Sequence, residues 1–348
     1  MTRRSHSVQG NDQRDDQQRG VVLLSVLLIL ALLTALSYQL VGRHSLVVAQ
    51  ARQTYGGDQS LAYALGGEAL ARQMLFEDWS QTGQGVDTLL EAWAQPLQPF
   101  EIEEGFLEIQ IRDLNRCFNL NSVASGNGNA GTKANLQRFK TLLRNHNIPA
   151  NIGDLWLDWI DPDQQISGFG AEDGDYLLAP RAYRTANGPA GHISELMLLK
   201  DIEPDHVRVL QSLTCTLPEA ELKLNVNTAS AAALAALSPS LTESQMLSFT
   251  ESERSFENVS EVTSEYPDLA TAVDVLSVTS EYFEVQVRAE VDGNLTELAS
   301  VLYRNPSDGS MKLLSRDFGR SFQSLFVEAG DASSSEFAAD RSTSSGGG

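Results

Sequence analysis

The sequence is poor in basic residues and in the residue types that mark a catalytic or redox centre. Among 348 residues there are 25 lysines and arginines against 46 aspartates and glutamates, so the formal net charge is −21. Nucleic-acid backbones and anionic lipid surfaces repel such a chain. Two cysteines and five histidines are present, the histidines share no metal-type spacing, and no serine lies in a nucleophile elbow. These absences make nucleic acid a poor partner and leave an enzyme hypothesis without named catalytic residues.

Charge is also missing from the stretch between Val21 and Gly42. A helix of about 22 residues rises roughly 33 Å, which matches a hydrocarbon core of about 30 Å. No small-residue cleavage site follows it, although a secretory signal peptide requires one there. The polar segment 1–20 before it carries four arginines. The bias of basic residues therefore places this leader inside the cell and the bulk of the chain outside. An ordinary single-pass signal anchor is the alternative interpretation.

The junction between the leader and the apolar helix is a candidate processing site. Cleavage after Gly20 removes the charged leader and keeps the apolar helix, with Val21 as the new N-terminus. This arrangement resembles the type IV pilin and pseudopilin class, whose prepilin peptidases cut on the cytoplasmic side of the membrane. The predicted prepilin peptidase cleavage residues are therefore Gly20 and Val21.

Beyond Gly42 the chain keeps a helical pattern but becomes amphipathic. Apolar residues recur at helical spacing to about Asp78, with polar residues between them. Gly56 and Gly57 are positions where this helix could bend. The pattern predicts one helix of more than about 50 residues, half in the membrane and half packed on a domain.

Strand-like alternation occurs at two places that are far apart in the sequence. Residues 100–112 predict one hairpin, and 282–291 with 295–304 predict a second across an Asp-Gly-Asn turn, with 311–316 as a further strand. Between them lie about 160 residues with a helical pattern. The predicted fold is α+β, a pilin-like long N-terminal helix packed on an antiparallel sheet with a large inserted α-helical domain.

A set of motifs connects the chain with one known family. From Arg19 to about residue 316 there follow RG with the apolar helix, DLN-x-CFNLNS, DWID-x-D, GAED-x-x-Y, YR-x-AN, SEL and LNVNTA, in that order. As a set they resemble the type II secretion system protein K family, the large minor pseudopilins. The resemblance covers nearly the whole chain.

The resemblance implies a function, a location and partners. We expect a non-enzymatic minor pseudopilin at the tip of the pseudopilus, which supports export of folded proteins across the outer membrane. It would be a single-pass inner-membrane protein with its C-terminal bulk in the periplasm. The expected partners are the minor pseudopilins I and J and the prepilin peptidase, with no nucleic acid.

These expectations divide the chain into six segments. They are a prepilin leader at 1–20, a transmembrane helix at 21–42, the first part of the pseudopilin domain at 43–122, the inserted α-domain with helix–hairpin–helix-like modules at 123–278, the second part of the pseudopilin domain at 279–318, and a tail at 319–348. The tail is rich in serine, glycine and acidic residues and is predicted to be disordered, because it cannot bury enough apolar surface to order itself.

The position of Ser25 is consistent with a tip subunit. It is the fifth residue after the predicted cleavage site, where most pilins carry a glutamate. That glutamate neutralises the terminal ammonium of the subunit ahead, because an unpaired charge in an apolar environment is costly. A subunit with nothing ahead of it needs no such residue. Alternatively, Ser25 is simply tolerated in the helix.

The segment from Asp161 to Tyr176 concentrates oxygen ligands and glycines. Calcium takes six to eight oxygens from flexible loops, and the spacing here is not that of an EF-hand. The resemblance adds that K-type pseudopilins bind calcium in the inserted domain. An acidic solvated loop is the alternative. We expect structural calcium with these ligands: Asp161, Asp163, Glu172, Asp173 and Asp175.

The two cysteines, Cys117 and Cys215, form an even pair in a chain expected to face an oxidising compartment. We expect one disulfide that closes a loop of about 98 residues and stabilises the fold by on the order of 4 kcal/mol. Two unrelated buried thiols are the alternative.

Two rival functions are a calcium-dependent periplasmic enzyme and an anchored helix–hairpin–helix DNA-binding protein. The LNVNTA motif and the helix after it look like half of a helix–hairpin–helix module. Its turn, Ser238-Pro239-Ser240, lacks the glycines that meet phosphate, and the next segment is acidic. We therefore expect a packing scaffold, with Asn225 and Asn227 capping and ordering the turn before the helix.

Overall fold

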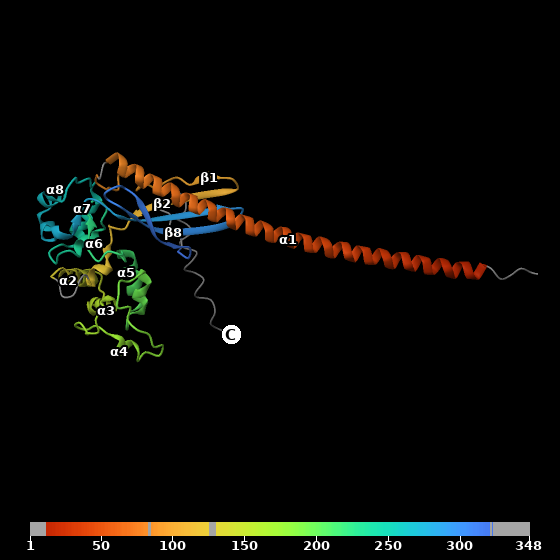
Figure 1. Ribbon diagram of the computed structural model, residues 1–348, viewed down its shortest axis with the longest axis horizontal. Helices are drawn as coiled ribbons and strands as arrows, with labels where there is room; N and C mark the ends of the chain where they lie inside the picture. Colours follow the sequence, from red (N-terminus) through yellow and green to blue (C-terminus); the bar gives the residue numbers. More distant parts are fainter. Residues whose placement is uncertain (1–11, 83–84, 125–129, 321, 323–348) are drawn as a thin grey trace, which may run out of the picture.

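The computed structural model describes residues 12–82, 85–124, 130–320 and 322. One very long helix lies against an antiparallel sheet and extends far beyond it, and a group of short helices lies at the opposite end (Figure 1). The predicted class, α+β with a pilin-like helix, an antiparallel sheet and an inserted helical domain, is confirmed.

The long helix, α1, comprises Asp12–Thr82 and so ends slightly beyond the predicted Asp78. It is the one helix among the described residues that is long and apolar enough to cross a membrane. Its most apolar window has a mean hydropathy of 2.6 and is not buried at all. The apolar side chains from Val21 to Val48 are exposed. An N-terminal apolar helix of this kind is consistent with a single-pass membrane anchor.

Contact of α1 with the sheet begins at Gln53, whose side-chain amide donates to Asn294 (2.9 Å), and helical structure continues through Gly56 and Gly57 without a break. A Cβ atom on Gly56 would lie 2.1 Å from Nδ2 of Asn294, and one on Gly67 would lie 2.8 Å from a methyl carbon of Val287. These two glycines therefore permit close approach of the helix to the sheet. The helix was expected to bend at Gly56 and Gly57, but it continues through both, and Gly56 packs on the sheet.

The sheet has five strands in the order β1-β2-β7-β8-β9, and every neighbouring pair is antiparallel. Both predicted hairpins and the additional strand are present. The strand bounds are β1 Phe100–Ile102, β2 Gly105–Asp113, β7 Tyr282–Val291, β8 Asn294–Arg304 and β9 Met311–Asp317.

A compact apolar core joins α1 to one face of the sheet. The helix contributes small or medium side chains, which let it lie close, and the strands contribute aliphatic side chains and Phe283. Trp93, from the loop after α1, packs edge-on against Phe283 with ring centroids 5.3 Å apart. The buried members of this core are Ala64, Ala71, Leu75, Trp93, Leu107, Ile109, Ile111, Phe283, Val285, Val287, Ala289, Leu298 and Leu302.

The inserted block leaves the sheet at the end of β2 and returns at the start of β7. Because these strands are adjacent and antiparallel, Asp113 lies opposite Phe283. The backbone N–H of Leu114 donates to Tyr282 (2.9 Å), and the side chain of Asn115 accepts from the N–H groups of Glu281 and Tyr282 (3.0 Å each). The two crossing points are therefore held together by hydrogen bonds.

The block is mostly helical and has its own core. Its helices are η1 Leu120–Ala124, α2 Ala130–Asn145, α3 Asn151–Ile160, α4 Asp173–Tyr176, η2 Ile193–Leu198, α5 Pro204–Leu213, α6 Ala231–Ala235, α7 Glu243–Glu251, α8 Val259–Glu265 and η3 Pro267–Val275.

Two short parallel ladders, which the helical pattern did not predict, connect distant parts of the block. They pair β3 Phe118–Asn119 with β4 Thr214–Cys215, and β5 Leu224–Asn225 with β6 Leu276–Ser277. Phe118 already belongs to the core of the helical domain. The predicted boundary between 122 and 123 therefore falls inside this unit, which begins just after β2.

The predicted leader at 1–20 and tail at 319–348 lie largely outside the described residues. The described part of the leader, 12–20, continues α1. Of the predicted tail, only Gly319, Arg320 and residue 322 are described.

A buried carboxylate, Glu68, ties the middle of α1 to the sheet. The guanidinium of Arg316 donates to both of its oxygens (2.7 and 2.9 Å), and the hydroxyl of Ser300 donates to one (2.6 Å). Arg72, one turn along α1, also pairs with it. Burial alone would raise the pKa of Glu68, but the hydrogen bonds from Arg316 and Ser300 and the charges of both arginines outweigh it. The pKa is therefore held below its usual 4.5.

We expect Glu68→Gln to destabilise the folded chain by on the order of 2 kcal/mol at pH 7, the scale of hydrogen bonds to a charged group. Because the folded pKa lies below the unfolded one, this stabilisation is present above pH 4.5 and is lost as pH falls through the folded value. Thermal melts of the detergent-solubilised chain at pH 7 and below pH 4 measure the difference. Glu77→Gln, at an exposed position of the same helix, is the control. A Glu68→Gln deficit that does not shrink in acid would contradict the ion-pair account.

Candidate metal centre

Helix α3 places three carboxylates along one side and at its end. Asp154, Asp158 and Asp161 are spaced by four and three residues, so they lie on neighbouring turns of one face. The helix ends at Ile160, and Asp161 is its C-cap, whose N–H donates to the carbonyl of Leu157 (2.9 Å). Sequence reasoning missed Asp154 and Asp158, and their helical spacing is the signal that could have found them.

The loop after α3 folds back onto these side chains. The N–H of Ser167 donates to both oxygens of Asp158 (3.0 and 3.2 Å). Lys140 pairs with Asp154 at 2.5 Å. Gly168 has a φ of +56°, and a Cβ on Gly170 would lie 1.9 Å from a carboxylate oxygen of Asp158. The loop therefore needs glycine at these two positions to wrap around the helix end.

Asp161, Asp163 and Glu172 converge where this loop closes. Each offers a carboxylate oxygen, and the three oxygens lie within 4.8 Å of one another. Glu172 is only 4% exposed. Within the described part of the chain, neither of its oxygens has a hydrogen-bond partner, and the same is true of Oδ1 of Asp161. Buried, unpaired carboxylate oxygens that face other carboxylates are costly unless a cation joins them.

The pKa values of the cluster also favour a bound cation. Burial raises the pKa of Glu172 to about 7, and the charges of Asp158, Asp161 and Asp163 add to the effect. Burial also raises the pKa of Asp158 to about 7 and that of Asp161 to about 6. Carboxyl groups are thus pushed toward the protonated form at neutral pH. A divalent cation would reverse this, because it stabilises the ionised forms.

The donor set fits a hard cation such as calcium. Three carboxylates offer up to six oxygens, and calcium accepts six to eight in a flexible geometry. Asp163 also has an oxygen bound by the N–H of Gln165 (2.8 Å), which orients its carboxylate. Asp161, Asp163 and Glu172 are therefore the residues that would hold the ion.

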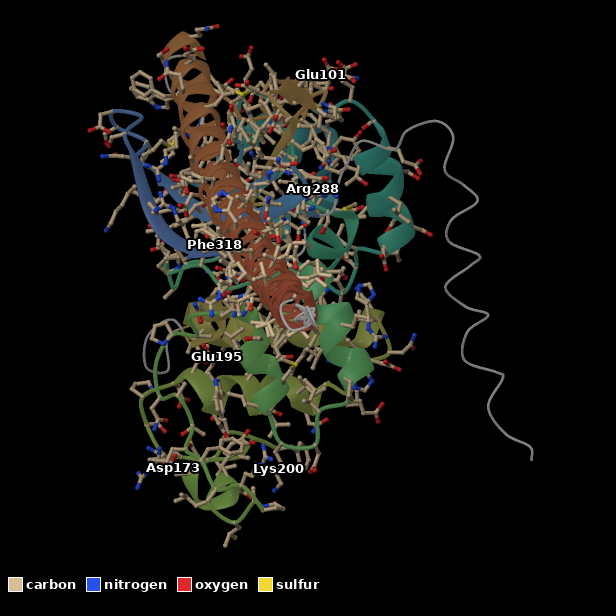
Figure 2. All side chains as sticks on the ribbon, turned by 90° about the vertical axis from the view of Figure 1, so that its right-hand side faces the viewer. Glu101, Asp173, Glu195, Lys200, Arg288 and Phe318 are labelled. Atoms are coloured by element: carbon tan, nitrogen blue, oxygen red, sulfur yellow. A yellow bond between two sulfur atoms is a disulfide. The ribbon has the colours of Figure 1, made fainter. Side chains whose placement is uncertain are left out.

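The other two predicted ligands are not brought to this cluster. Asp173 pairs with Arg184 (3.0 Å) and accepts hydrogen bonds from the N–H and hydroxyl of Thr185 (3.0 Å each). Asp175 pairs with Lys200 at 2.8 Å, which lowers its pKa. Asp173 and Lys200 lie at the end of the helical domain farthest from the sheet (Figure 2). Their partners lie 11 and 25 residues farther along the chain, outside the acidic segment, so its composition gave no sign of them.

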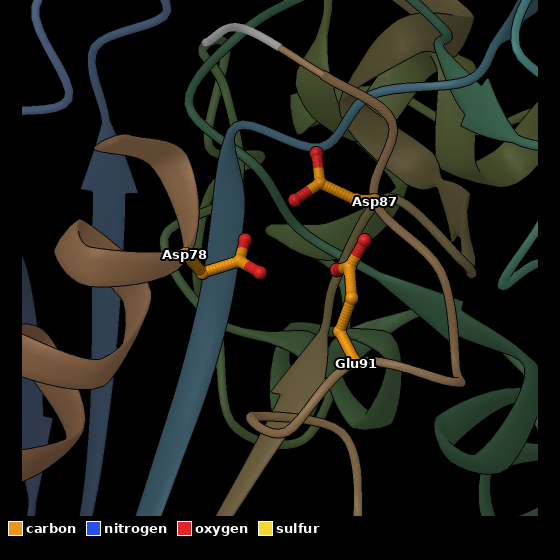
Figure 3. A group of neighbouring side chains, drawn as sticks. All are labelled: Asp78, Asp87 and Glu91. Atoms are coloured by element: carbon orange, nitrogen blue, oxygen red, sulfur yellow. The ribbon is translucent and has the colours of Figure 1, made fainter. Parts of the chain in front are cut away.

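A second acidic group lies at the end of α1. The carboxyl groups of Asp78, Asp87 and Glu91 point toward one another, and their oxygens lie within 4.8 Å (Figure 3). Here the protein supplies its own cation: Arg304 pairs with Asp87 and lies 3.6 Å from Asp78. Glu91 accepts from Nε1 of Trp93 (2.6 Å). This group therefore works as an ion-pair junction between α1, the following loop and β8.

Cys117 and Cys215, the predicted pair, are joined by a disulfide with their Cα atoms 5.9 Å apart. They flank the β3–β4 ladder, because Cys117 precedes β3 and Cys215 is the last residue of β4. The bond spans 98 residues of sequence. It fastens the start of the helical domain to its middle.

Gly20 and Val21, the predicted cleavage residues, lie within α1, and the side chains described begin at Val21. The hydroxyl of Ser25 donates to the carbonyl of Val21 at 2.8 Å, so its polar group is satisfied within its own helix. Position 25 is thus neutral and needs no partner from another subunit.

The helix–hairpin–helix-like segment is packed into the helical core. All five residues of α6 are buried, and the hydroxyls of Ser238 and Ser240 in the turn bond to each other (2.9 Å). Ser230, and not Asn225 or Asn227, is the N-cap of α6, so the capping part of the prediction was wrong. The side-chain oxygen of Asn225 accepts from the N–H of Asn227 (3.0 Å) and so orders the turn before the helix, as predicted. The side-chain amide of Asn225 also donates to the carbonyl of Asp87 and the hydroxyl of Ser280, and Asn227 bonds to the backbone of Phe256.

A helix with an exposed apolar half and a half packed on an antiparallel sheet, with a helical domain inserted between two strands, defines a pilin-like fold. A family model described as "Type II secretion system (T2SS), protein K" matches residues 116–219. The chain is 39% identical over 230 residues to Type II secretion system protein K of Pseudomonas aeruginosa, covering 63% of this chain and 68% of that protein. It is 35% identical over 232 residues to the protein of the same name from Klebsiella pneumoniae, covering 64% and 71%. The chain belongs to the type II secretion system protein K family.

A solved structure has the same fold. It is a chain of the GspK-GspI-GspJ complex from the enterotoxigenic Escherichia coli type 2 secretion system, with a TM-score of 0.67 and 24% identity. The match covers 78% of this chain and 99% of that one. A minor-pseudopilin role fits this family and this fold.

Proposed function

We propose that the protein is the tip subunit of a type II secretion pseudopilus and supports export of folded proteins across the outer membrane. It would be anchored in the inner membrane by α1, with its C-terminal bulk in the periplasm. The observation that carries this proposal is that the exposed apolar half of α1 and the inserted helical domain lie at opposite ends of the molecule (Figure 1).

The exposed half of α1 suits a fibre whose subunits share a helical core. From Val21 to Gln53 the helix extends about 50 Å before it meets the sheet. Its apolar side chains are exposed in the isolated chain. The same side chains can face lipid before assembly and neighbouring helices afterwards, because both environments are apolar.

The neutral Ser25 favours a place at the end of the fibre. A buried ammonium needs a nearby negative charge, and this helix offers none at position 25 to a subunit ahead of it. Its own Val21 amine, once exposed by processing, can still be neutralised by a subunit behind. The helix is thus suited to contacts in one direction.

The position of the inserted domain also favours the end of the fibre. The domain lies at the sheet end of α1, beside and partly beyond the end of the helix (Figure 1). A bulky domain in that position would obstruct a further subunit on the same side. The similar solved structure is a complex of GspK with GspI and GspJ. The corresponding minor pseudopilins I and J are therefore the proposed partners of this chain, and the prepilin peptidase its processing enzyme.

We propose no enzymatic role. The titratable groups that the structure describes in its two carboxylate clusters are arranged as an ion-pair junction and as a cation site. Neither shows a nucleophile beside a general base. Hydrolytic activity of the purified chain in the presence of calcium would instead favour the enzyme alternative.

Processing after Gly20 gives the first test. The mature protein is expected to begin at Val21, with an N-methylated amine, because a prepilin peptidase would read the junction before the apolar helix. Mass spectrometry of the N-terminal peptide from purified membranes measures this. A mature chain beginning after residue 35 would show conventional signal-peptide removal and would exclude the pseudopilin proposal.

Single cysteines placed along the exposed helix test the tip position. Cysteines at Leu36 and Leu40 are expected to cross-link to the organism's minor pseudopilins I and J and not to a second copy of this chain. Both native cysteines are in the disulfide, so the unmodified chain is the control. Abundant cross-links between two copies would identify a repeating shaft subunit instead.

The cluster of Asp161, Asp163 and Glu172 is proposed to hold a structural calcium ion. The support is its buried, unpartnered oxygens and the raised pKa values of Glu172 and Asp161. The ion would fix the loop after α3 onto the helix end. Its place in the helical domain, away from α1, makes it a stabilising ion for that domain.

Calcium is expected to raise the melting temperature of the solubilised chain. At a calcium concentration 100 times Kd the stabilisation is about 2.7 kcal/mol. Asp161→Asn combined with Glu172→Gln is expected to abolish the increment. Asp175→Asn, which removes the pair with Lys200, is the matched control and is expected to keep it.

The rise in melting temperature that calcium causes is also expected to depend on pH. Since the calcium-free folded state has pKa values of about 6 at Asp161 and about 7 at Glu172, protons compete with calcium as pH falls through that range. The increment should therefore shrink between pH 7.5 and 5.5. An increment that survives the double substitution would place the ion elsewhere.

A further inference from the structure

A cavity of about 700 Å³ lies where the disulfide-bearing part of the helical domain meets the end of the sheet. Cys117 and Cys215 line it from the helical domain, and Glu284 and Leu314 line it from β7 and β9. The anchor, the proposed fibre contacts and the carboxylate cluster after α3 do not use it. Its size is that of pockets that hold small ligands or a few residues of a peptide.

Three arginines line this cavity in a chain that is otherwise strongly acidic: Arg112, Arg116 and Arg320. Two of them share one buried carboxylate. Arg320 pairs with Glu284, and Nη1 of Arg112 lies 3.9 Å from the other oxygen of Glu284. That second oxygen also accepts from the amide of Gln286 at 2.8 Å. The acceptor capacity of Glu284 is thus largely used by groups other than Arg116.

Arg116 is left without a partner. Within the described part of the chain, its guanidinium makes no hydrogen bond and no ion pair. The neighbouring Asp113 has its oxygens bound by Ser280, Thr228 and the N–H of Asn115. Burial raises the pKa of Asp113 to about 6, so it is still mostly ionised at pH 7, and its charge offsets part of the repulsion on Arg116 although no ion pair joins the two.

Like charges surround Arg116 as well. Burial, and then the charge of Arg112, lower the pKa of Arg116. Arg254, which is fixed by hydrogen bonds to the carbonyls of Val226 and Ala229, has its pKa lowered to about 10 by burial and by the charge of Arg116. A half-buried guanidinium among other cations is an unfavourable arrangement that a bound anion would relieve.

We propose that this cavity binds a carboxylate carried by a segment of a partner protein, with Arg116 as its anchor. A guanidinium fork matches a carboxylate, and such charge-assisted pairs are the strong ones. Ile193, Leu213 and Leu314 in the lining offer contacts for apolar side chains beside the acid. The acidic remainder of the surface repels such a segment, so the cavity directs it to one place. The proposal does not depend on the tip position or on calcium.

Binding is tested with the detergent-solubilised full chain and two dye-labelled peptides. The probes are acetyl-Leu-Glu-Leu-amide and the same peptide with glutamine in place of glutamate. The glutamate peptide is expected to bind at least tenfold more tightly, with an affinity that falls as salt rises. Arg116→Gln should remove the discrimination, and Arg116→Lys should keep part of it. Arg181→Gln, at an exposed arginine outside the cavity lining, is the control.

The melting temperature of the Arg116→Gln variant shows whether Arg116 has a binding role or a structural one. Because Arg116 has no partner to lose, Arg116→Gln is expected to leave the melting temperature of the free chain unchanged or to raise it. A clear drop in the melting temperature would show a structural role and overturn the proposal. Equal affinity for the two peptides, or no binding by either, would also overturn it.

Two further measurements identify the source of the carboxylate. Inorganic phosphate and glutarate are expected to compete only weakly with the peptide. If either binds as tightly as the peptide, the occupant is a small free anion and not a protein segment. A chain ending at Arg320 is expected to bind the peptide as the full chain does. Tighter binding by the shortened chain would mean that carboxylates of residues 321–348 occupy the cavity.

Discussion

The antiparallel pairing of β2 with β7 is the constraint on which the rest of this structure depends. It brings Asp113 opposite Phe283, so a block of more than 160 residues can leave the sheet and return at one point. The crossing is then closed by buried polar groups: Ser280 donates to Asp113 and Asp87, and Arg304 donates to the carbonyl of Ser280. Because these groups are buried, losing one would leave its partners unsatisfied. The sheet and the helical domain are therefore fixed to each other at their narrowest connection.

The long helix gives the molecule its direction. Its outer half presents apolar side chains to any apolar surroundings, and its inner half is fixed on the sheet by close glycine contacts and by the ion pairs of Glu68. The helical domain lies at the end of the molecule opposite to the exposed apolar half of α1 (Figure 1). An exposed apolar helix at one end and a large domain at the other is the geometry on which the proposed place at the end of a fibre rests.

Local sequence was sufficient for the elements that depend on local patterns. The apolar run from Val21, the alternation in β2 and β7, and the turn after Val291 each predicted the correct element, since periodicity and turn chemistry act over a few residues. The acidic loop after Asp161 was also located from its composition. The limits of this reasoning appear where partners are distant: Asp173 and Asp175 share the loop but pair with Arg184 and Lys200.

The sequence by itself determined the anchor, the strand order within each hairpin, the family and the region of the carboxylate cluster, because each is encoded by neighbouring residues or by an ordered set of motifs. Only the tertiary structure decided which carboxylates share a site and which arginine is left unpaired. Glu172 meets Asp161 because a loop turns through Gly168 and Gly170. Arg116 forms no ion pair with Asp113, whose Oδ2 is hydrogen-bonded by Thr228 and Ser280. Charge–charge distances depend on the folding of the chain in space, and sequence spacing does not specify them.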